Sequence, residues 1–314
     1  MSSDHHCRVC NSAAGSAMRA GDNEYFRCAQ CGTLQKELTA ADYAAMEVTY
    51  DPGLYLTGAD RKELRAFLGV DDKKLELERI AADMGRSPSG MRLLDVGCGM
   101  GGFLAAGDEL GMMVRGFEPS HTHSRVTREV WQLPVTEDYF SADKVVGEKF
   151  DIVILSHVIE HIYAPRDFIV ELVSVLAPGG TLLMITPNAD SLVAHATGPQ
   201  WPMLVPADHV TMLTPRALDR LVPEGCTIRT RTSEYRFEFI ATLLSVAKSR
   251  LRGRQVNVGP LVAEEAPKTM QSLGLAGRAV RAGLSVASFP FYLAVVGTNR
   301  ASCLVTTIRA PETA

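Results

Sequence analysis

The sequence predicts an α/β protein with a doubly wound, mostly parallel sheet and a final antiparallel hairpin, preceded by a small metal ribbon. Between residues 91 and 187, apolar strand-like runs alternate with helix-like runs, which is the rhythm of a parallel sheet with helices on both faces. One strand-to-helix junction in this region is rich in glycine. The ribbon is predicted by two Cys-x-x-Cys pairs that precede the sheet.

The composition favours one large domain with a smaller attachment. The chain has 314 residues, of which 46% are hydrophobic and 22% charged, and its mean hydropathy is +0.03. A net charge of −4 argues against a nucleic-acid partner. The polar N-terminal stretch lacks the apolar core of a secretory signal, and the seven cysteines are an odd number. We therefore expect a reducing, cytoplasmic location.

The spacing of four cysteines predicts a structural zinc site. Each pair fits a tight knuckle, and two knuckles together offer four thiolates in a tetrahedron. Such a closed set leaves no open position for a catalytic water, and four free structural cysteines are the alternative. Residues 5–36 hold few apolar side chains, so we expect metal binding to supply most of the ribbon's stability. The predicted ligands are Cys7, Cys10, Cys28 and Cys31.

The charge of the ribbon argues against RNA binding. From Met1 to Asp60 there are four basic residues and eight acidic ones, whereas a surface that follows phosphates needs the reverse. We expect a structural role, or a wall of the substrate cleft.

A helical linker is predicted over residues 39–87, between the ribbon (1–38) and the main domain (88–314). Within it, residues 43–60 are rich in Gly, Pro and Tyr and could close over a cofactor as a lid, with Tyr50 and Tyr55 as contacts. Equally, these tyrosines could pack the linker against the main domain.

The main domain is predicted from its alternating elements. In parallel sheets ligands lie at the carboxyl ends of the strands, where the glycine-rich junction falls. The predicted strands are 91–96, 112–118, 150–156 and 181–187, and the predicted helices are 101–111, 121–132 and 165–180.

The glycine junction predicts an adenine cofactor. Gly97, Gly99 and Gly102 form a G-x-G-x-x-G pattern, and Glu118 ends the next strand, where a carboxylate can bind both ribose hydroxyls. These features fit NAD equally well. Asp95, however, would crowd a pyrophosphate and suits a cationic ligand, and no second nucleotide-binding half follows residue 187. S-adenosylmethionine, which is cationic and has no phosphate, therefore fits better.

Four segments in order resemble class I S-adenosylmethionine-dependent methyltransferases, which have a Rossmann-like fold. They are "LLDVGCGMGGF", "GFEPS", "FDIVILSHVIEHIYAP" and "LAPGGTLLMITPN", and the resemblance extends over residues 92–228. A narrower resemblance is to bacterial members with an N-terminal zinc ribbon, which methylate nucleotide-linked sugars, surface glycans and natural products. Their later motif is matched by Trp201 and "DHVTMLTP" (208–215).

The resemblance implies a set of cofactor contacts. The methionine part of the cofactor would be lined by Asp95, Gly97, Cys98 and Gly99, and the ribose would be bound by Glu118, followed by Pro119 and Ser120. Asp138 would meet the adenine amine, and Ser156 and His157 would border the methyl group. Cys98 also admits a role as nucleophile, but a small residue required by the tight loop is the favoured interpretation.

Candidate catalytic residues follow the strand at 150–156. A hydroxyl acceptor benefits from a base, and we expect His161 in that role, with His157 positioning the cofactor or acceptor and Glu160 near the acceptor. The spacing of four would place both histidines on one helical face. His161 bonded to backbone at a helix start is the alternative. The order H-V-I-E-H departs from the H-E-x-x-H of metalloproteases, which argues against a second metal.

Two later residues are further candidates. His209 is the alternative base, and Trp201 is either a platform for a sugar or ring, or ordinary core packing.

The C-terminal part predicts a helix at 214–225, a strand at 226–239 and a last strand at 301–311 inserted beside it, the last of these implied by the resemblance. A helical insertion lies between them at about 240–300. Its stretch 275–297 could contact a membrane surface or a lipid-linked acceptor, or could be buried against the domain or at a dimer contact.

Together these features predict a cytoplasmic methyltransferase that methylates oxygen in a small-molecule or glycan-like acceptor. The alternatives are an RNA methyltransferase that uses the ribbon for RNA, and a cofactor-binding scaffold without activity. Neither the acceptor nor the oligomeric state can be read from the sequence.

Overall fold

The computed structural model describes residues 6–13, 15–38, 43, 60–204, 208–233, 295 and 297–312. Tyr50, Tyr55, nearly all of the proposed lid and nearly all of the 240–300 insertion lie outside these ranges. Contacts divide the chain into two units. The ribbon unit comprises Met1–Leu38, Thr186–Arg220 and Thr230–Val305, and the loop unit comprises Thr39–Ile185, Leu221–Arg229 and Thr306–Ala314.

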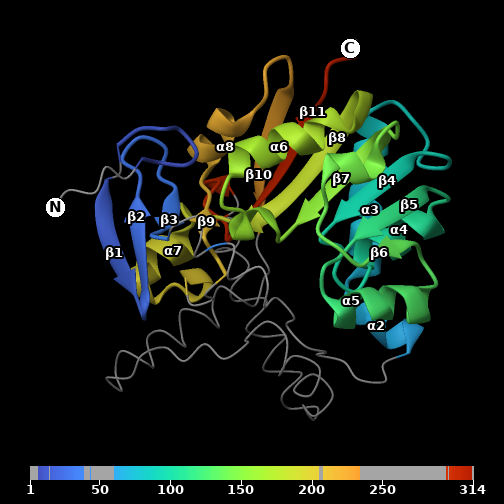
Figure 1. Cartoon of the computed structure of the whole chain (residues 1–314), viewed down its shortest axis with the longest axis horizontal. Coiled ribbons are helices and arrows are strands. Elements are labelled where there is room, and N and C mark those ends of the chain that lie inside the picture. The colour runs from blue at the N-terminus through green and yellow to red at the C-terminus, as the bar shows by residue number, and fades with distance from the viewer. Residues whose placement is uncertain are drawn as a thin grey trace. The chain divides into compact units, whose positions relative to one another are not determined.

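The described strands and helices follow one another as in Figure 1. The strands are β1 (Ser16–Ala20), β2 (Asn23–Arg27), β3 (Leu34–Lys36), β4 (Arg92–Val96), β5 (Met113–Phe117), β6 (Val135–Thr136), β7 (Phe150–Ser156), β8 (Leu176–Pro187), β9 (Thr211–Met212), β10 (Thr227–Ser233) and β11 (Cys303–Arg309). The α-helices are α2 (Arg61–Phe67), α3 (Val70–Asp83), α4 (Gly102–Glu109), α5 (His121–Val126), α6 (Pro165–Ser174), α7 (Leu192–Thr197) and α8 (Pro215–Leu221). The shorter turns are the π-turn η1 (Thr127–Trp131) and the 3-10 turns η2 (Ala142–Val145), η3 (Ile159–His161), η4 (Gly198–Gln200) and η5 (Pro202–Leu204).

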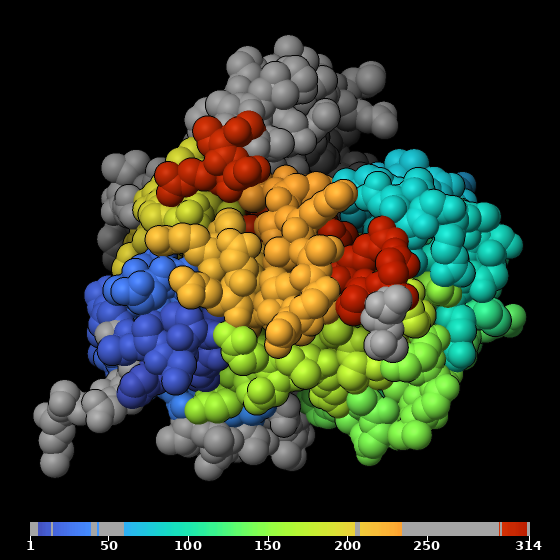
Figure 2. Space-filling model, turned by 90° about the horizontal axis from the view of Figure 1, so that it is seen from above, coloured from blue at the N-terminus to red at the C-terminus, as the bar shows by residue number. Residues whose placement is uncertain are grey.

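A seven-stranded sheet in the order β10-β11-β8-β7-β4-β5-β6 confirms the predicted α/β class. β4 pairs in parallel with both β5 and β7, and β6 and β8 continue the parallel pairing outward. β11 lies between β8 and β10, so the last strand is inserted where the sequence resemblance placed it. The edge strand β10 lies at the surface (orange in Figure 2). This parallel arrangement brings the carboxyl ends of β4, β5 and β7 to one edge of the sheet.

Two helix predictions need correction. The helix predicted over 165–180 ends at Ser174, and β8 begins at Leu176, so the Pro-Gly-Gly segment lies in a strand. Gly179 has φ +69°, a conformation that a helix excludes, and the β7–β8 register shifts between Phe150 and Ile152. The helix predicted over 121–132 is regular only to Val126 and then widens into the π-turn η1.

The ribbon sheet has the order β1-β2-β3-β9, so a strand from far along the chain completes it. Tyr25 and Leu34 pack with Trp201, Leu204 and Met212 in one buried cluster. The ribbon therefore does not rely on its own few apolar side chains, and the expectation that metal binding supplies most of its stability overlooked this shared core.

Within the described ranges, no helix combines the length and apolar character needed to cross a membrane.

Candidate functional site

The glycine loop after β4 is held against the end of β5. The amides of Gly97 and Cys98 both donate to Phe117 O, at 2.8 and 3.0 Å. Gly97 has φ +68°, and a Cβ at this position would lie 2.5 Å from Val158 Cγ2. Only glycine therefore fits where the loop passes the residues that follow β7.

Glu118 ties this loop to the start of α5. Its Oε2 accepts from Gly99 N at 2.8 Å, and its Oε1 accepts from Ser120 N at 2.9 Å. Glu118 is buried, and Pro119 lies between it and Ser120 in the chain. Ser120 in turn caps α5 by accepting from His123 N. The Glu118 carboxylate is thus fixed at the carboxyl end of β5, where the sequence analysis predicted a contact with the cofactor ribose.

The π-turn η1 supports the loop from behind, which sequence reasoning missed. Thr127 Oγ1 donates to Gly99 O at 3.1 Å, and Trp131 Nε1 donates to Met100 O at 2.9 Å. A Cβ on Gly101, whose φ is +82°, would lie 2.9 Å from Thr127 Oγ1. No sequence pattern predicts a π-turn, although such turns are frequent at functional sites.

Asp95 provides the test of whether the loop fits a cationic cofactor. Its side chain is 2% exposed and accepts no hydrogen bond from any residue that the structure describes. Burial raises the pKa of Asp95 to about 7; the charge of Lys73 opposes this rise and that of Glu118 adds to it. A Cβ on Gly99 would meet no atom within 4 Å. A buried carboxylate that lacks a hydrogen-bond donor among the described residues, in a loop with open space at Gly99, fits a ligand that carries positive charge.

The remaining predicted cofactor contacts differ in their surroundings. Burial raises the pKa of the Cys98 thiol, and a Cβ on Gly116 would lie 2.9 Å from Cys98 Sγ, so this residue packs against the sheet and is a poor nucleophile. Asp138 lies at the surface 2.6 Å from Lys144 Nζ, and that hydrogen bond lowers its pKa. Its contact with adenine stays a prediction.

The end of β7 presents a histidine beside a buried carboxylate. Ser156 is the last residue of β7, and His157 N donates to Ile185 O. His157 has φ +56°, a conformation that non-glycine residues adopt rarely and mostly at functional sites. Its Nδ1 lies 3.3 Å from Glu160 Oε1; Glu160 is 1% exposed and the His157 side chain is 46% exposed.

The predicted helical face at this point is wrong. His161 ends the 3-10 turn η3, and His157 lies before that turn in the left-handed region, so the two histidines share no α-helical face. His157 is kept at the sheet by its backbone bond to β8, and Val158 follows it at the close approach to Gly97.

The ribbon unit brings the four predicted cysteines together. Their Sγ atoms all lie within 4.8 Å of one another. The two knuckles have the same backbone pattern: Asn11 N donates to Cys7 O and Gly32 N to Cys28 O, and both donors have positive φ. The hydrogen bond from the Cys7 thiol is the largest of the effects that lower the pKa of Cys31, to about 4. Four clustered sulfurs, with a thiolate favoured among them, suit zinc.

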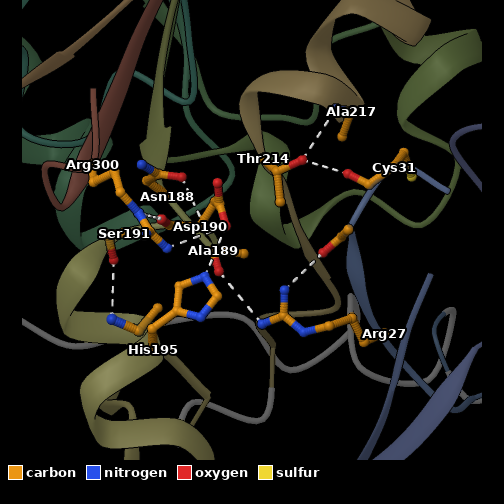
Figure 3. A network of polar contacts seen from close by, with 12 residues as sticks. Arg27, Cys31, Asn188, Ala189, Asp190, Ser191, His195, Thr214, Ala217 and Arg300 are labelled. Atoms are coloured by element: carbon orange, nitrogen blue, oxygen red, sulfur yellow. Dashed lines mark hydrogen bonds and ion pairs between the residues drawn. The ribbon is translucent and has the colours of Figure 1, made fainter. Parts of the chain in front are cut away.

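A polar network in the same unit links the second knuckle to the chain after β8 (Figure 3). Arg27 donates to Gly32 O and to Ala189 O, at 3.3 and 3.5 Å. Thr214 Oγ1 donates to Cys31 O at 2.5 Å and accepts from Ala217 N at the start of α8. The "DHVTMLTP" segment therefore packs against the cysteine site, a connection that the sequence motif did not reveal.

The two later candidates lie in the ribbon unit. Trp201 is 3% exposed within the apolar cluster, which favours core packing over a platform for a sugar. His209 Nδ1 lies 2.7 Å from Met203 O, and its role as a base stays a prediction.

Comparisons with known proteins agree on one family. Residues 70–224, roughly half of the chain, match the family model described as methyltransferase domain. A ubiquinone biosynthesis O-methyltransferase of Chelativorans sp. (strain BNC1) is 35% identical over 124 residues, which cover 35% of this chain and 48% of that protein. One from Dinoroseobacter shibae (strain DSM 16493 / NCIMB 14021 / DFL 12) is 32% identical over 165 residues, covering 47% and 66%.

The chain spans about half the length of the first of these relatives. Among solved structures, the plantazolicin methyltransferase BamL, in complex with a triazolic desmethylPZN analog and SAH, has a TM-score of 0.47 at 14% identity, covering 80% of this chain and 87% of that one.

Proposed function

We propose that residues 70–224, which match the methyltransferase-domain model, form a class I S-adenosylmethionine-dependent methyltransferase, and that it methylates a hydroxyl oxygen of a small-molecule or glycan-like acceptor. The observation that carries this proposal is His157, held beside buried Glu160 at the same sheet edge as the glycine loop. The names of the relatives, which are O-methyltransferases, support oxygen as the acceptor atom. The class of the acceptor follows the narrower sequence resemblance.

Different residues of the loop unit would bind different parts of the cofactor. When bound, S-adenosylmethionine supplies a methyl group on a positively charged sulfur, a good leaving group. Asp95, which is buried, would face the positive part of the cofactor, Glu118 would accept from the ribose hydroxyls, and the glycines would let the backbone approach closely. Much of the rate in such a displacement comes from alignment, which this fixed loop provides.

His157 is our first candidate for the general base, because its Nδ1 lies 3.3 Å from Glu160 Oε1; a ring nitrogen of His161 also lies within 4.8 Å of a Glu160 carboxylate oxygen. Glu160 beside Nδ1 favours the proton on that nitrogen and leaves the lone pair at Nε2, on a side chain that reaches solvent. Nε2 can then take the proton of the acceptor hydroxyl. Glu160 acts as a positioning residue, and His161 remains the second candidate from the sequence.

Replacing the base tests this assignment. We expect His157→Gln to lower kcat at neutral pH by about 100-fold, the lower end of the usual contribution of a general base. With a phenolic acceptor, alkaline pH should restore part of the loss, because a phenol that ionises by itself needs no base, whereas a sugar hydroxyl should show no such recovery. The exposed His121, which pairs with Glu137, offers a matched control in His121→Gln. A loss confined to His161→Gln would return the role to His161, and full activity in both variants would exclude a base on this segment.

The chemistry of the product tests the acceptor atom. Methyl ethers release their methyl group as methyl iodide in hot hydriodic acid, whereas C-methyl groups do not. We expect label transferred from S-adenosylmethionine to be released in this way. Label that resists release would contradict O-methylation, and label in the RNA fraction would favour the alternative in which the ribbon binds RNA.

We also propose that the four cysteines hold one structural zinc ion. Their close approach and the matching pair of knuckles support it, and a thiolate site of this kind suits the reducing cytoplasm that the cysteine usage predicts. The zinc would fix the knuckle to which Arg27 and Thr214 bind, and it would take no part in the transfer.

A further inference from the structure

The carboxylate of Asp95 is in a costly position before any cofactor arrives. It lies at the end of β4, where its backbone neighbours are Gly116 on β5 and Ile154 on β7, neither of which can neutralise it. Among the residues that the structure describes, the charges that act on it are those of Glu118, which follows β5 and raises its pKa, and Lys73 from α3, which lowers it. Only the last of these is a cation.

Lys73 reaches the loop because α3 packs closely on α4. A Cβ on Gly102, the first residue of α4, would lie 3.1 Å from Lys73 Cε, so the third glycine of the pattern makes room for this side chain. Lys73 Nζ donates to Leu68 O at 2.5 Å and lies 5.2 Å from the centroid of the Phe103 ring. The half-buried ammonium is therefore fixed at the loop by a carbonyl and an aromatic face, and does not point freely into water.

We propose that Lys73 is a positioning residue that keeps Asp95 ionised, and that it thereby sets the pH range in which the domain binds its cationic cofactor. The inference rests on the proposed contact between Asp95 and the cofactor, and it does not depend on the acceptor. Lys73 offsets part of the buried negative charge from its place against Gly102, while a Cβ on Gly99 would meet no atom within 4 Å, so the loop keeps open space for a ligand.

The direction of the pH effect follows from the charges. A carboxylate pairs with a cation only when it is ionised, so affinity is full above the pKa of Asp95 and falls as the pH drops through it. Burial raises that pKa to about 7 even though the charge of Lys73 opposes the rise. Without Lys73 the pKa rises, and the loss of affinity begins at higher pH. Binding near this pKa should also release a proton from Asp95.

Calorimetric titration with S-adenosylmethionine from pH 6 to 9, in buffers of different ionisation enthalpy, measures both the affinity and the number of protons released on binding. For the unmodified protein we expect proton release and a break in affinity near pH 7. Lys73→Met, which keeps the length and apolar stem, should move the break up by about one pH unit and weaken binding about fivefold at pH 7, in line with the smaller ionised fraction of Asp95. At pH 9 it should bind as tightly as the unmodified protein or more tightly, which also shows that the variant is folded.

Two variants serve as controls. Lys74→Met removes the next lysine of α3, which pairs with Glu109, and should leave the pH profile unchanged. Lys73→Arg keeps the charge and should restore most of the normal profile. An unchanged profile in Lys73→Met, or no proton release by the unmodified protein, would overturn the proposal. If Asp95→Asn binds the cofactor normally, the placement of the cofactor at Asp95 fails instead.

Discussion

Glu118→Gln is expected to weaken binding of S-adenosylmethionine by about 100-fold. The two carboxylate oxygens of Glu118 accept hydrogen bonds from the backbone N–H groups of Gly99 and Ser120. A glutamine side chain has only one oxygen, so it could accept only one of these two hydrogen bonds. Hydrogen bonds to a charged group contribute about 1.5–3 kcal/mol, and a 100-fold change in affinity corresponds to about 2.7 kcal/mol. The cofactor ribose would also lose its charged acceptor.

Equilibrium dialysis with S-adenosylmethionine and S-adenosylhomocysteine measures this effect. Both ligands carry the ribose, so we expect the variant to lose affinity for both to a similar degree. Glu129→Gln changes a surface carboxylate on the nearby π-turn and should bind normally. Normal affinity in Glu118→Gln, accompanied only by a lower melting temperature, would show that Glu118 supports the loop without contacting the cofactor.

Loss of the metal is expected to be the largest single perturbation of the ribbon unit. Structural zinc sites of four thiolates contribute on the order of 10 kcal/mol of folding free energy. Here the second knuckle also binds Arg27 and Thr214, so its collapse would release contacts to Ala189 and α8. We expect Cys28→Ser to lose the zinc and much of the protection of this unit from hydrogen exchange, while the loop unit stays protected.

Metal analysis and hydrogen exchange together check the result. The protein should contain one zinc per chain, and Cys226→Ser, which changes a cysteine outside the cluster, should retain it. A metal-free protein in which residues 186–214 remain protected would contradict the structural role, since it would show that the apolar core around Tyr25 suffices.

The sequence predicted the sheet well because its strands are short apolar runs bounded by glycine and proline. β4, β5 and β7 lie within one residue of the expected limits, and Asp95, Gly97 and Glu118 lie together at one edge because parallel strands place their carboxyl ends there. The cluster of four cysteines could also be predicted from the sequence, because the spacing within each Cys-x-x-Cys pair is set by the geometry of the knuckle.

The structural features that the sequence analysis did not predict depend on contacts between segments far apart in the chain. In an amphipathic helix Lys73 resembles any solvent-facing lysine, and only the packing of α3 on α4 brings it to the loop. β9 has two residues, too few for a periodic signal, although it completes the ribbon sheet. The prediction of a helix through His157 was wrong because the backbone at His157 is in the left-handed region, which the presence of a histidine does not by itself predict.

We propose that this chain transfers methyl groups from S-adenosylmethionine to a small-molecule or glycan-like acceptor. Incubating the protein with labelled cofactor and an extract of its native organism, then separating nucleotide sugars, lipids, polysaccharide, protein and RNA, tests it most directly. We expect label in one soluble or glycan fraction, and far less of it when Glu118→Gln replaces the unmodified protein at the same low cofactor concentration. Label in no fraction, despite tight cofactor binding and an extract shown to contain methylatable acceptors for another methyltransferase, would contradict the claim and favour a cofactor-binding scaffold.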